Sequence, residues 1–428
     1  MGSFLGIRTT DDFVADQRPK NWREAILHLW PTGSAPLTAI SAMMPSEKVD
    51  DPQFHWWTKK LPTQRGTVTG VYTDSALTSA YSSGGSSGDT LYFKMSADDA
   101  GHFRKGMEVV ARYTGDLDLD VVGKVTNRSI NGANSYIEVR LMEDDDNSGT
   151  YNLSDADVLM VLTSLNEEGA STPESLLYDP IKYYNYTYIA RTSLKMTRTA
   201  LRTRLRTGDQ YKEAKREALE LHSIMLEKAW LMSIPYEGVG ENGYPERATA
   251  GLFYFGRTYV PENVLDFKKD HAGSTWLDKG DEWLDAALER WFRWGSDPLA
   301  LAGSGAMLGI QKLAKASGTL MIEPSADIGY GFKVHGLVTS FGDVPLRVHP
   351  LMSIEPTLRN TIIIIAPKHL RYRYIDDTTF IGQKSDFGFD SEGKRVDARV
   401  EEFLTEAGLE YDFPDTIMIL NNVGVDAT

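Results

Sequence analysis

The stretch TGDQYKEAKREALELHSIMLEKAWLMSI, residues 207–234, contains the longest unbroken helical pattern in the chain. Its apolar residues recur at three- and four-residue steps, and the apolar stripe widens toward the C-terminal half. Thr207 or Asp209 can cap the first free amides, and Pro235 forces Ile234 out of the helix. A helix of about 25 residues is roughly 38 Å long. The stretch therefore predicts one long amphipathic helix, and it carries no obvious chemistry.

The composition indicates a folded protein with few chemical options. At 428 residues the chain could form about three units of ordinary domain size. It contains no cysteine, which excludes disulfides, thiolate metal sites and cysteine nucleophiles. The formal charge of −15 argues against a protein that wraps nucleic acid, because phosphate binding needs clustered Lys and Arg. No run is long enough to span a bilayer and no signal peptide is visible, so we expect no membrane partner.

The N-terminal region, to about residue 53, is predicted to be an extended arm with one short helix. In the segment WREAILHLW, Trp22 and Trp30 belong to an apolar face that ends at Pro31. An arm with such anchors is expected to pack on the rest of the chain or on a neighbouring molecule. The alternative is an ordinary N-terminal helix on its own core.

A β-rich excursion follows the arm. Residues 54–75 alternate and predict strands around a turn, and YSSGGSSG, residues 81–88, predicts a flexible linker. Five short strand candidates come next, separated by turn signals: residues 91–95, 107–113, 121–125, 136–142 and 158–162. Five strands in about 75 residues predict a small barrel or sandwich.

A basic run leads from this excursion into the long helix. The chain returns through a predicted strand at residues 181–197, and Arg198, Arg202, Arg204 and Arg206 follow it. These arginines could contact acidic partners or DNA. They could equally form salt bridges within or between subunits, because the chain is otherwise strongly acidic.

The C-terminal half is predicted to be mixed. Residues 251–259 begin a strand-rich region, and a second amphipathic helix capped by Asp278 or Asp281 ends at Gly295. A β-α-β unit follows, with its strands at residues 298–302 and 319–322 and its helix at 306–316. Further strands are predicted at residues 344–348, 362–366, 370–375 and 417–420, with a helix-then-strand element near 400–411.

One glycine cluster invites an enzymatic interpretation. Gly303, Gly305 and Gly309 lie between a predicted strand and helix, and Glu323 lies about 20 residues downstream, as in dinucleotide-binding folds. The G-x-G-x-x-x-G spacing departs from that fingerprint, and no further β-α repeats follow. A nucleotide-binding enzyme is therefore the alternative function, and tight strand-to-helix packing is the simpler explanation.

The acidic stretch DDDNSGTYNLSD is a weak calcium candidate. Asp144, Asp146, Ser148 and Asp155 fall on positions one, three, five and twelve of a calcium loop, with Gly149 at the turn. Its flanks are strands, however, and an ordinary acidic hairpin loop explains it as well. Asp386-Phe387-Gly388 and the scattered histidines match no complete catalytic or metal motif. We therefore expect no catalytic residues and no cofactor.

In this order of elements, the chain resembles the major capsid (major head) proteins of tailed phages, which have the Hong Kong 97-type fold. Four parts of the sequence carry the resemblance: SAPLTAISAMMPSEKVDDPQFHWWTKKL, the bounded β excursion, the long helix, and VEEFLTEAGLEYDFPDTIMILNNVG. The resemblance covers nearly the whole chain and rests on the order of the elements and on these quoted segments.

The resemblance implies an α+β capsid fold with five parts. Residues 1–53 form the N-terminal arm, and residues 54–208 form an extended β loop carrying an inserted small β-domain at about 88–165. The peripheral domain takes residues 209–275 and 361–412, with the spine helix at 209–234. The axial domain takes residues 276–360 and 413–428.

The resemblance also implies a function and partners. Such proteins are structural, not enzymatic, and assemble as hexamers and pentamers into an icosahedral virion shell around double-stranded DNA. Because the arm begins almost at once, a separate scaffolding protein is expected, with a portal and minor capsid or decoration proteins as further partners. DNA contact is expected to be weak and non-specific. The candidates for intersubunit contact are Trp22, Trp30, Phe54, Trp56, Trp57, Lys59, Lys60, Arg198, Arg202, Arg204 and Arg206.

Overall fold

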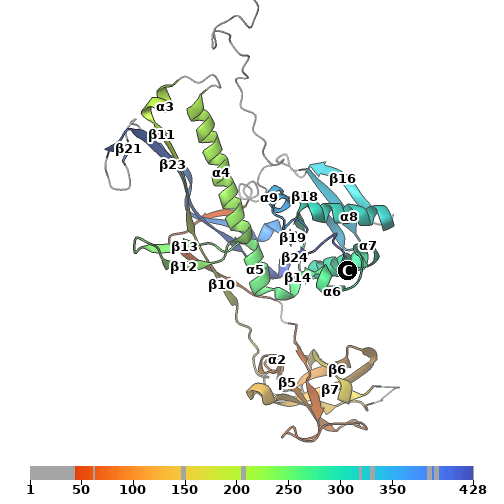
Figure 1. Ribbon diagram of the computed structural model, residues 1–428. Coiled ribbons are helices and arrows are strands. Elements are labelled where there is room, and N and C mark those ends of the chain that lie inside the picture. The colour runs from red at the N-terminus through yellow and green to blue at the C-terminus, as the bar shows by residue number, and fades with distance from the viewer. Residues whose placement is uncertain are drawn as a thin grey trace, which may run out of the picture. The chain divides into compact units, whose positions relative to one another are not determined.

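The chain forms two compact units (Figure 1). The computed structural model describes residues 44–60, 63–145, 151–203, 209–317, 321–327, 333–382, 388–389 and 395–427. Unit 1 combines the chain up to Thr58 with Lys182–Thr428, and unit 2 is the continuous segment Lys59–Ile181. Unit 2 is therefore an insertion in the sequence of unit 1.

The long helix of unit 1, α4 (Gln210–Met232), confirms the predicted helix. Asp209 is its N-cap, and its carboxylate accepts hydrogen bonds from the amides of Tyr211 and Lys212. The other cap candidate, Thr207, lies outside the described residues. The helix ends at Ser233, two residues before Pro235, as expected from the restriction that proline places on the preceding backbone.

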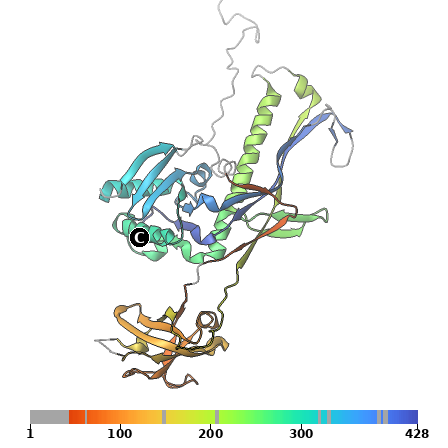
Figure 2. The ribbon, with the colours of Figure 1, turned by 180° about the vertical axis from the view of Figure 1, so that it is seen from behind.

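A four-stranded sheet lies against α4. Its order is β1 (Ser46–Lys48), β20 (Leu370–Ile381), β23 (Ala398–Tyr411) and β11 (Tyr188–Thr197). Figures 1 and 2 show α4 running along the long strands. The predicted helix within residues 400–411 is wrong, because β23 is one 14-residue strand. It pairs antiparallel with β20 on one side and β11 on the other, and this pairing outweighs its local helical propensity.

The second large sheet of unit 1 has seven strands. Their order is β14 (Val264–Asp266), β24 (Met418–Asn421), β19 (Ile362–Ile365), β15 (Leu299–Ala302), β18 (Gly342–Val348), β17 (Lys333–Thr339) and β16 (Met321–Asp327). The strands predicted around residues 344–348, 362–366 and 417–420 are thus confirmed, and the one predicted at 370–375 is confirmed as part of β20 in the four-stranded sheet. β14 pairs with β24, and β19 pairs with β15 and β24, so both strands belong to this sheet. The domain boundaries predicted from the sequence grouped these two strands with the peripheral domain.

Both faces of this sheet are buried, which explains its apolar central strands. On β19, Ile362 and Ile364 pack into one hydrophobic core, and Ile363 and Ile365 pack into another. None of the four is more than 2% exposed. Because successive strand side chains point to opposite faces, one strand can join two cores.

Helices cover both faces. On one face, α7 (Trp276–Phe292) and α8 (Ser304–Ser317) contribute to the core that contains Ile362 and Ile364. The helix α7 begins before Asp278, because Thr275 is its N-cap and the carboxylate of Asp426 accepts a hydrogen bond from the Trp276 amide at 2.8 Å. A cap supplied by a residue 150 positions away leaves no local sequence signal.

The prediction that residues 251–259 begin a strand-rich region is wrong. Most of this segment forms the helix α5 (Leu252–Tyr259), whose aromatic residues pack in the other core. Gly251 precedes it because a Cβ there would lie 2.7 Å from the carbonyl oxygen of Ala229 on α4. A short aromatic run does not distinguish helix from strand by itself.

The remaining helices and strands of unit 1 are short. They are β2 (Gln53–Thr58), β10 (Ile181–Tyr186), α3 (Arg198–Arg202), β12 (Tyr236–Val239), β13 (Pro245–Ala248), α6 (Phe267–Asp270), α9 (Pro350–Ile354), β21 (Gly388–Phe389) and β22 (Arg395–Val396). Among the described helices, none is long and apolar enough to cross a bilayer.

Unit 2 is an antiparallel sheet with its own apolar core. Its order is β3 (Arg65–Thr67), β9 (Val158–Ser164), β6 (Met107–Tyr113), β7 (Asp116–Ser129), β8 (Ser135–Leu141), β5 (Thr90–Met95) and β4 (Gly70–Tyr72), and the short helix α2 (Ala97–Ala100) follows β5. All five strands predicted between residues 91 and 162 are confirmed.

The two ends of this sheet are consecutive in the chain, so the sheet closes into a small barrel. Between β3 and β4, the amide of Val68 donates to the Asp157 carbonyl at 2.7 Å, and the amide of Thr69 donates to the Lys94 carbonyl at 2.8 Å. One bent segment thus bonds to both β9 and β5. Closure removes free sheet edges, and apolar side chains fill the interior.

The predicted linker at residues 81–88 is wrong. The side chain of Tyr81 is buried, and its hydroxyl donates to the carboxylate of Asp145 at 2.5 Å and accepts from the Gly85 amide at 2.8 Å. The segment is a packed loop of unit 2. Small polar residues occur in packed turns as well as in linkers, and only the buried tyrosine separates the two cases.

Candidate assembly surfaces

The structure separates the predicted contact residues into three groups. Trp22, Trp30, Arg204 and Arg206 lie outside the described residues. Phe54 and Trp56 are buried, with 7% and 6% of their surface exposed. The exposed candidates are Trp57, Lys59, Arg198 and Arg202, and Lys60 is half-buried.

Phe54 and Trp56 are core residues of their own chain. Their rings stack at a centroid distance of 6.0 Å, and Trp56 also contacts Tyr183 and Phe255. Both rings therefore pack in the core of their own chain, and their contact with a neighbouring subunit stays a prediction. Two consecutive tryptophans point to opposite faces of a strand, and only packing shows which of them is inside.

Trp57 lies on the outer face of the two-stranded ribbon formed by β2 and β10. It is 61% exposed, and the ammonium group of Lys182 lies 5.6 Å from the centre of its ring. His55 and Tyr184 flank it on the same outer face, with their rings 6.3 Å apart. This exposed aromatic surface is what we call the ribbon face.

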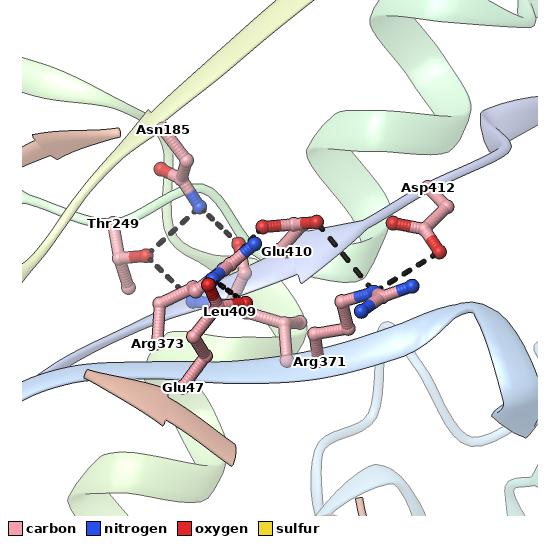
Figure 3. Close-up of polar contacts among 8 residues, drawn as sticks. All are labelled: Glu47, Asn185, Thr249, Arg371, Arg373, Leu409, Glu410 and Asp412. Atoms are coloured by element: carbon pink, nitrogen blue, oxygen red, sulfur yellow. Dashed lines mark hydrogen bonds and ion pairs between the residues drawn. The ribbon is translucent and has the colours of Figure 1, made fainter. Parts of the chain in front are cut away.

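Asn185 fixes the ribbon to the body of unit 1 (Figure 3). Its side-chain amide is fully buried and donates to the Leu409 carbonyl at 2.6 Å and to the Thr249 hydroxyl at 3.0 Å. Its oxygen accepts from the amides of Ala250 and Tyr186. One side chain thus links β10, β23 and the segment before α5. Sequence reasoning missed it, because a lone asparagine gives no signal of burial.

An ion cluster attaches β1, the first described strand after the arm region. Arg373 on β20 contacts Glu47 of β1 and donates to Glu410 of β23 at 2.5 Å (Figure 3). Burial alone would lower the pKa of Arg373, but these two carboxylates raise it. Burial raises the pKa of Glu410, and Arg373 acts against that rise. Arg371 bonds to Asp412 at 3.2 Å beside them. Since β1 pairs over only three residues, this cluster is a major part of its attachment.

Polar contacts hold α4 against its surroundings at three positions. The hydroxyl of Tyr211 donates to Glu401 on β23 at 2.7 Å. The ring of His222 lies between the hydroxyls of Thr192 and Thr405, at 2.9 and 2.8 Å, and burial lowers its pKa. Glu227 pairs with His349 at 2.6 Å, and both side chains are fully buried. These contacts position the helix without creating a reactive site.

Arg198, in the described part of the basic run, forms a salt bridge within the chain. Arg198 pairs with Asp397 at 2.8 Å, and both side chains are about half exposed. This contact fits the interpretation that the arginines balance an acidic chain. An exposed pair of this kind contributes little to stability and leaves the arginine accessible.

The nucleotide-site alternative is wrong, because the chain itself fills the glycine turn. A Cβ at Gly303 would lie 2.3 Å from the Arg359 carbonyl oxygen, and one at Gly305 would lie 2.0 Å from Oδ1 of Asn360. The amides of Gly305 and Ala306, at the start of α8, both donate to the Arg359 carbonyl. The amides that would receive a pyrophosphate are already used. The glycines allow close packing, as the simpler explanation held.

The described part of the acidic stretch is used in loop hydrogen bonds. The Asp144 carboxylate accepts from the Ser87 amide at 2.7 Å, and that of Asp155 accepts from the Asn152 amide at 3.2 Å. Asp146 and Ser148 lie outside the described residues. Within the described ranges, no three acidic or histidine side chains gather as a metal site.

The comparison with known families supplies the class of the protein. Residues 7–424 match the family model described as SU10 major capsid protein, and this match spans nearly the whole chain. Major capsid proteins are structural components of the virion. The chain belongs to the SU10 major capsid protein family. It is a non-enzymatic capsid component that forms the icosahedral phage head.

One sequence relative agrees with this assignment, and the chain is also similar to solved structures. The chain is 21% identical over 389 residues to a major capsid protein of Pseudomonas phage PaMx41, covering 88% of this chain and 83% of that relative. Among solved structures, it is similar to a chain of the capsid of the native GTA particle, with a TM-score of 0.46, 9% identity, and 96% and 97% coverage of the two chains. It is also similar to a chain from Mycobacterium phage Bobi, with a TM-score of 0.45, 9% identity, and 96% and 98% coverage.

Proposed function

We propose that the capsid subunit has the Hong Kong 97-type layout, with boundaries adjusted to its sheets. The peripheral domain is α4 with the four-stranded sheet, and the axial domain is the seven-stranded sheet with α7 and α8. The extended loop is the β2–β10 ribbon, and unit 2 is the domain inserted into it. The observation that carries this assignment is the 23-residue helix α4. Tyr211 and His222 bond it to β23, 190 and 183 residues further along the chain, and His222 also bonds it to β11, which follows the β excursion directly.

In the shell, the subunit forms hexamers and pentamers through the ribbon face. An exposed tryptophan beside a lysine is an unusual surface feature, and buried tryptophans are common anchors of protein interfaces. Trp57 is therefore the proposed anchor, with Lys59, Lys60, Arg198 and Arg202 as further contact residues. In the sequence-based proposal, Trp22 and Trp30 of the arm and Arg204 and Arg206 of the basic run extend these contacts.

The remaining partners follow from the same proposal. A scaffolding protein, a portal, and minor capsid or decoration proteins cooperate in building the head around double-stranded DNA. The net charge of −15 supports weak and non-specific contact with that DNA, because strong phosphate binding needs an excess of clustered Lys and Arg. No metal or other cofactor is part of the proposal.

Electron microscopy of particles formed on co-expression with the neighbouring gene products tests the layout. We expect closed particles with six-fold and five-fold capsomers, and α4 near each capsomer's periphery. A chain that stays monomeric across a wide concentration range by light scattering, or particles without such capsomers, would contradict the proposal.

Substitution of Trp57 tests the ribbon face separately. We expect Trp57→Asp to reduce particle yield at least about tenfold, because it removes a buried anchor and adds a charge at an interface. Trp57→Tyr is the matched control and should retain most of the yield. Equal yields for Trp57→Asp and the wild type would remove the ribbon face from the proposal.

A further inference from the structure

The β12–β13 hairpin is a second surface that a single chain leaves uncovered. Its strands pair only with each other, from Tyr236 opposite Ala248 to Val239 opposite Pro245. An isolated two-stranded hairpin is marginally stable in water. The hairpin follows α4 directly and has no part in the ribbon face.

The hairpin exposes several large apolar side chains. Val239 and Tyr244 are each 75% exposed, and Tyr236 is 51% exposed. The Tyr236 ring lies over Gly238, where a Cβ would be only 2.0 Å from the tyrosine oxygen. Glycine at this position lets the ring lie flat against the strand. The hairpin therefore presents a smooth apolar face and an apolar tip.

The hairpin is also acidic. Residues 234–246 contain Glu237, Glu241 and Glu246 but neither lysine nor arginine. Glu237 pairs with Arg247 at 2.9 Å, at the base of the hairpin. The excess carboxylates thus lie toward the tip, beside Val239 and Tyr244. A complementary surface would combine exposed cations with exposed apolar side chains.

The N-terminal half of α4 provides that combination. Lys212, Arg216 and Leu219 follow the spacing of one helix face and are 82%, 76% and 43% exposed. The Lys212 ammonium lies 3.7 Å from Asp209, and Arg216 pairs with Glu220 at 3.0 Å. Exposed pairs of this kind are weak, so they can be exchanged for pairs across an interface.

These two surfaces belong to opposite ends of α4. Lys212 lies 20 residues before Met232, which corresponds to about 30 Å along the helix. Figures 1 and 2 both show the hairpin projecting sideways from the helix and not back along it. The tip can therefore meet the Lys212–Arg216–Leu219 face only on another copy of the chain.

We propose that the β12–β13 hairpin of one subunit docks on the Lys212–Arg216–Leu219 face of α4 in a neighbouring copy. Tyr244 and Val239 cover Leu219, and Glu241 and Glu246 approach Lys212 and Arg216. A second copy is the occupant because the chain is a shell subunit and because the charges of the two surfaces are complementary. Two different surfaces make the contact heterologous, and repetition of a heterologous contact builds rings when the rotation between copies closes. The contact rests on membership of the capsid family and not on the proposed capsomer layout.

The absence of cysteine allows a direct test. The double variant Tyr244→Cys with Leu219→Cys is assembled into particles and treated with a short bis-maleimide cross-linker. Because each copy carries both partners of a heterologous contact, we expect a ladder of covalent oligomers beyond the dimer. The single variants should give at most traces of dimer. A matched pair, Tyr244→Cys with Leu177→Cys, uses an 84% exposed leucine of unit 2 and should give no ladder.

Several results would overturn the docking contact. One is intact particles without a ladder, since the shell would then form without it. Another is an equal ladder from the matched pair, because the reaction would then report crowding only. A cross-link inside single chains, or one from Tyr244→Cys to a cysteine of another capsid protein, would assign the hairpin to a different occupant.

Charge reversal gives an independent readout. Glu241→Lys with Glu246→Lys, and separately Lys212→Glu with Arg216→Glu, should each lower particle yield at least about tenfold by placing like charges together. The four changes combined should restore assembly. Unchanged thermal unfolding of the purified subunits controls for folding. Failure of the combination to restore particles, or normal yields from both pairs, would contradict the contact.

Discussion

Unit 2 encloses one apolar core, whereas unit 1 has two cores and several buried ionisable side chains. In unit 1, Glu227, His349, Glu401 and Glu410 are each at most 2% exposed. In unit 2, Asp145, which is 7% exposed, is the single buried carboxylate among the described residues. Unit 2 is thus held mainly by barrel closure and apolar packing, and unit 1 also relies on polar links between segments far apart in sequence.

The charges of the two units differ as well. Residues 59–181 contain ten Lys and Arg and nineteen Asp and Glu, which is a formal net charge of −9 out of −15 for the whole chain. Unit 2 therefore carries more than half of the net charge in less than a third of the length. A continuous insertion with its own core and a strongly charged surface has what an independently folding domain needs.

The largest expected effects test whether the two units unfold separately. Trp291 in unit 1 and Phe93 in unit 2 are fully buried. Replacing either with alanine should cost about 3–5 kcal/mol. Trp291→Ala should shift only the unit 1 transition in calorimetry, and Phe93→Ala should shift only that of unit 2. If both variants shift one common transition, the units are not independent.

A smaller effect separates buried from exposed ion pairs. Arg373→Met leaves the buried Glu410 without its main cation and should destabilise unit 1 by about 3 kcal/mol. Arg112→Met removes a bond to Asp120 in unit 2, where both side chains are about 40% exposed, and should cost less than about 1 kcal/mol. Urea unfolding of the two variants measures the contrast. Equal losses would contradict the view that unit 1 depends more on its polar links.

A third prediction concerns the polar bond buried in unit 2. Burial, with the Asp145 carboxylate as the next cause, raises the pKa of Tyr81 to about 12, so this hydroxyl remains a donor at neutral pH. Tyr81→Phe should cost about 1–3 kcal/mol, because Asp145 loses a buried partner. Tyr92→Phe, in the same barrel, is the control and should stay within about 0.5 kcal/mol of the wild type. If Tyr81→Phe does not change the stability, the hydrogen bond of Tyr81 does not hold the loop at residues 81–88 in place.

The smallest expected effect is a pH dependence limited to unit 1. Burial lowers the pKa of His222 below its ordinary value of 6.5, so the unfolded chain binds the proton more tightly than the folded chain. The stability contributed by neutral His222 is therefore present above pH 6.5 and declines as the pH falls through that value. His222→Gln should lower stability at pH 7.5 but make the unit 1 transition less sensitive between pH 7.5 and 5. Thermal melts at these pH values measure this sensitivity. If the unit 1 melting temperature depends on pH as strongly in the variant as in the wild type, His222 is not a source of the pH dependence.

Sequence reasoning succeeded where the pattern is local. Three predictions with a clear period or turn signals are confirmed. They are the long helix capped by Asp209, the apolar strand at residues 362–366 and the five strands between residues 91 and 162. Sequence reasoning failed for α5 and for the helix expected in residues 400–411. The aromatic segment of α5 and the glutamate-rich segment of β23 each fit both a helical and a strand period. Packing and strand pairing in the folded chain decide between the two.

The candidate surfaces show the same division. The consecutive residues Trp56 and Trp57 look alike in sequence, but packing buries one and exposes the other. The hairpin face and the Lys212–Arg216–Leu219 face were not singled out from the sequence. Exposure decides both, and exposure depends on which other segments cover a residue.

The sequence by itself determined the long helix and the main strands, because short-range periodicity is a property of neighbouring residues, and its resemblance to tailed-phage major capsid proteins indicated the family. The tertiary structure decided the closure of the barrel, the use of the Gly303–Gly305 turn by the Arg359 carbonyl, and the burial of Glu410 beside Arg373. These features join residues that are tens to hundreds of positions apart. Their energies depend on desolvation and on partners brought in by the fold, which no local pattern records.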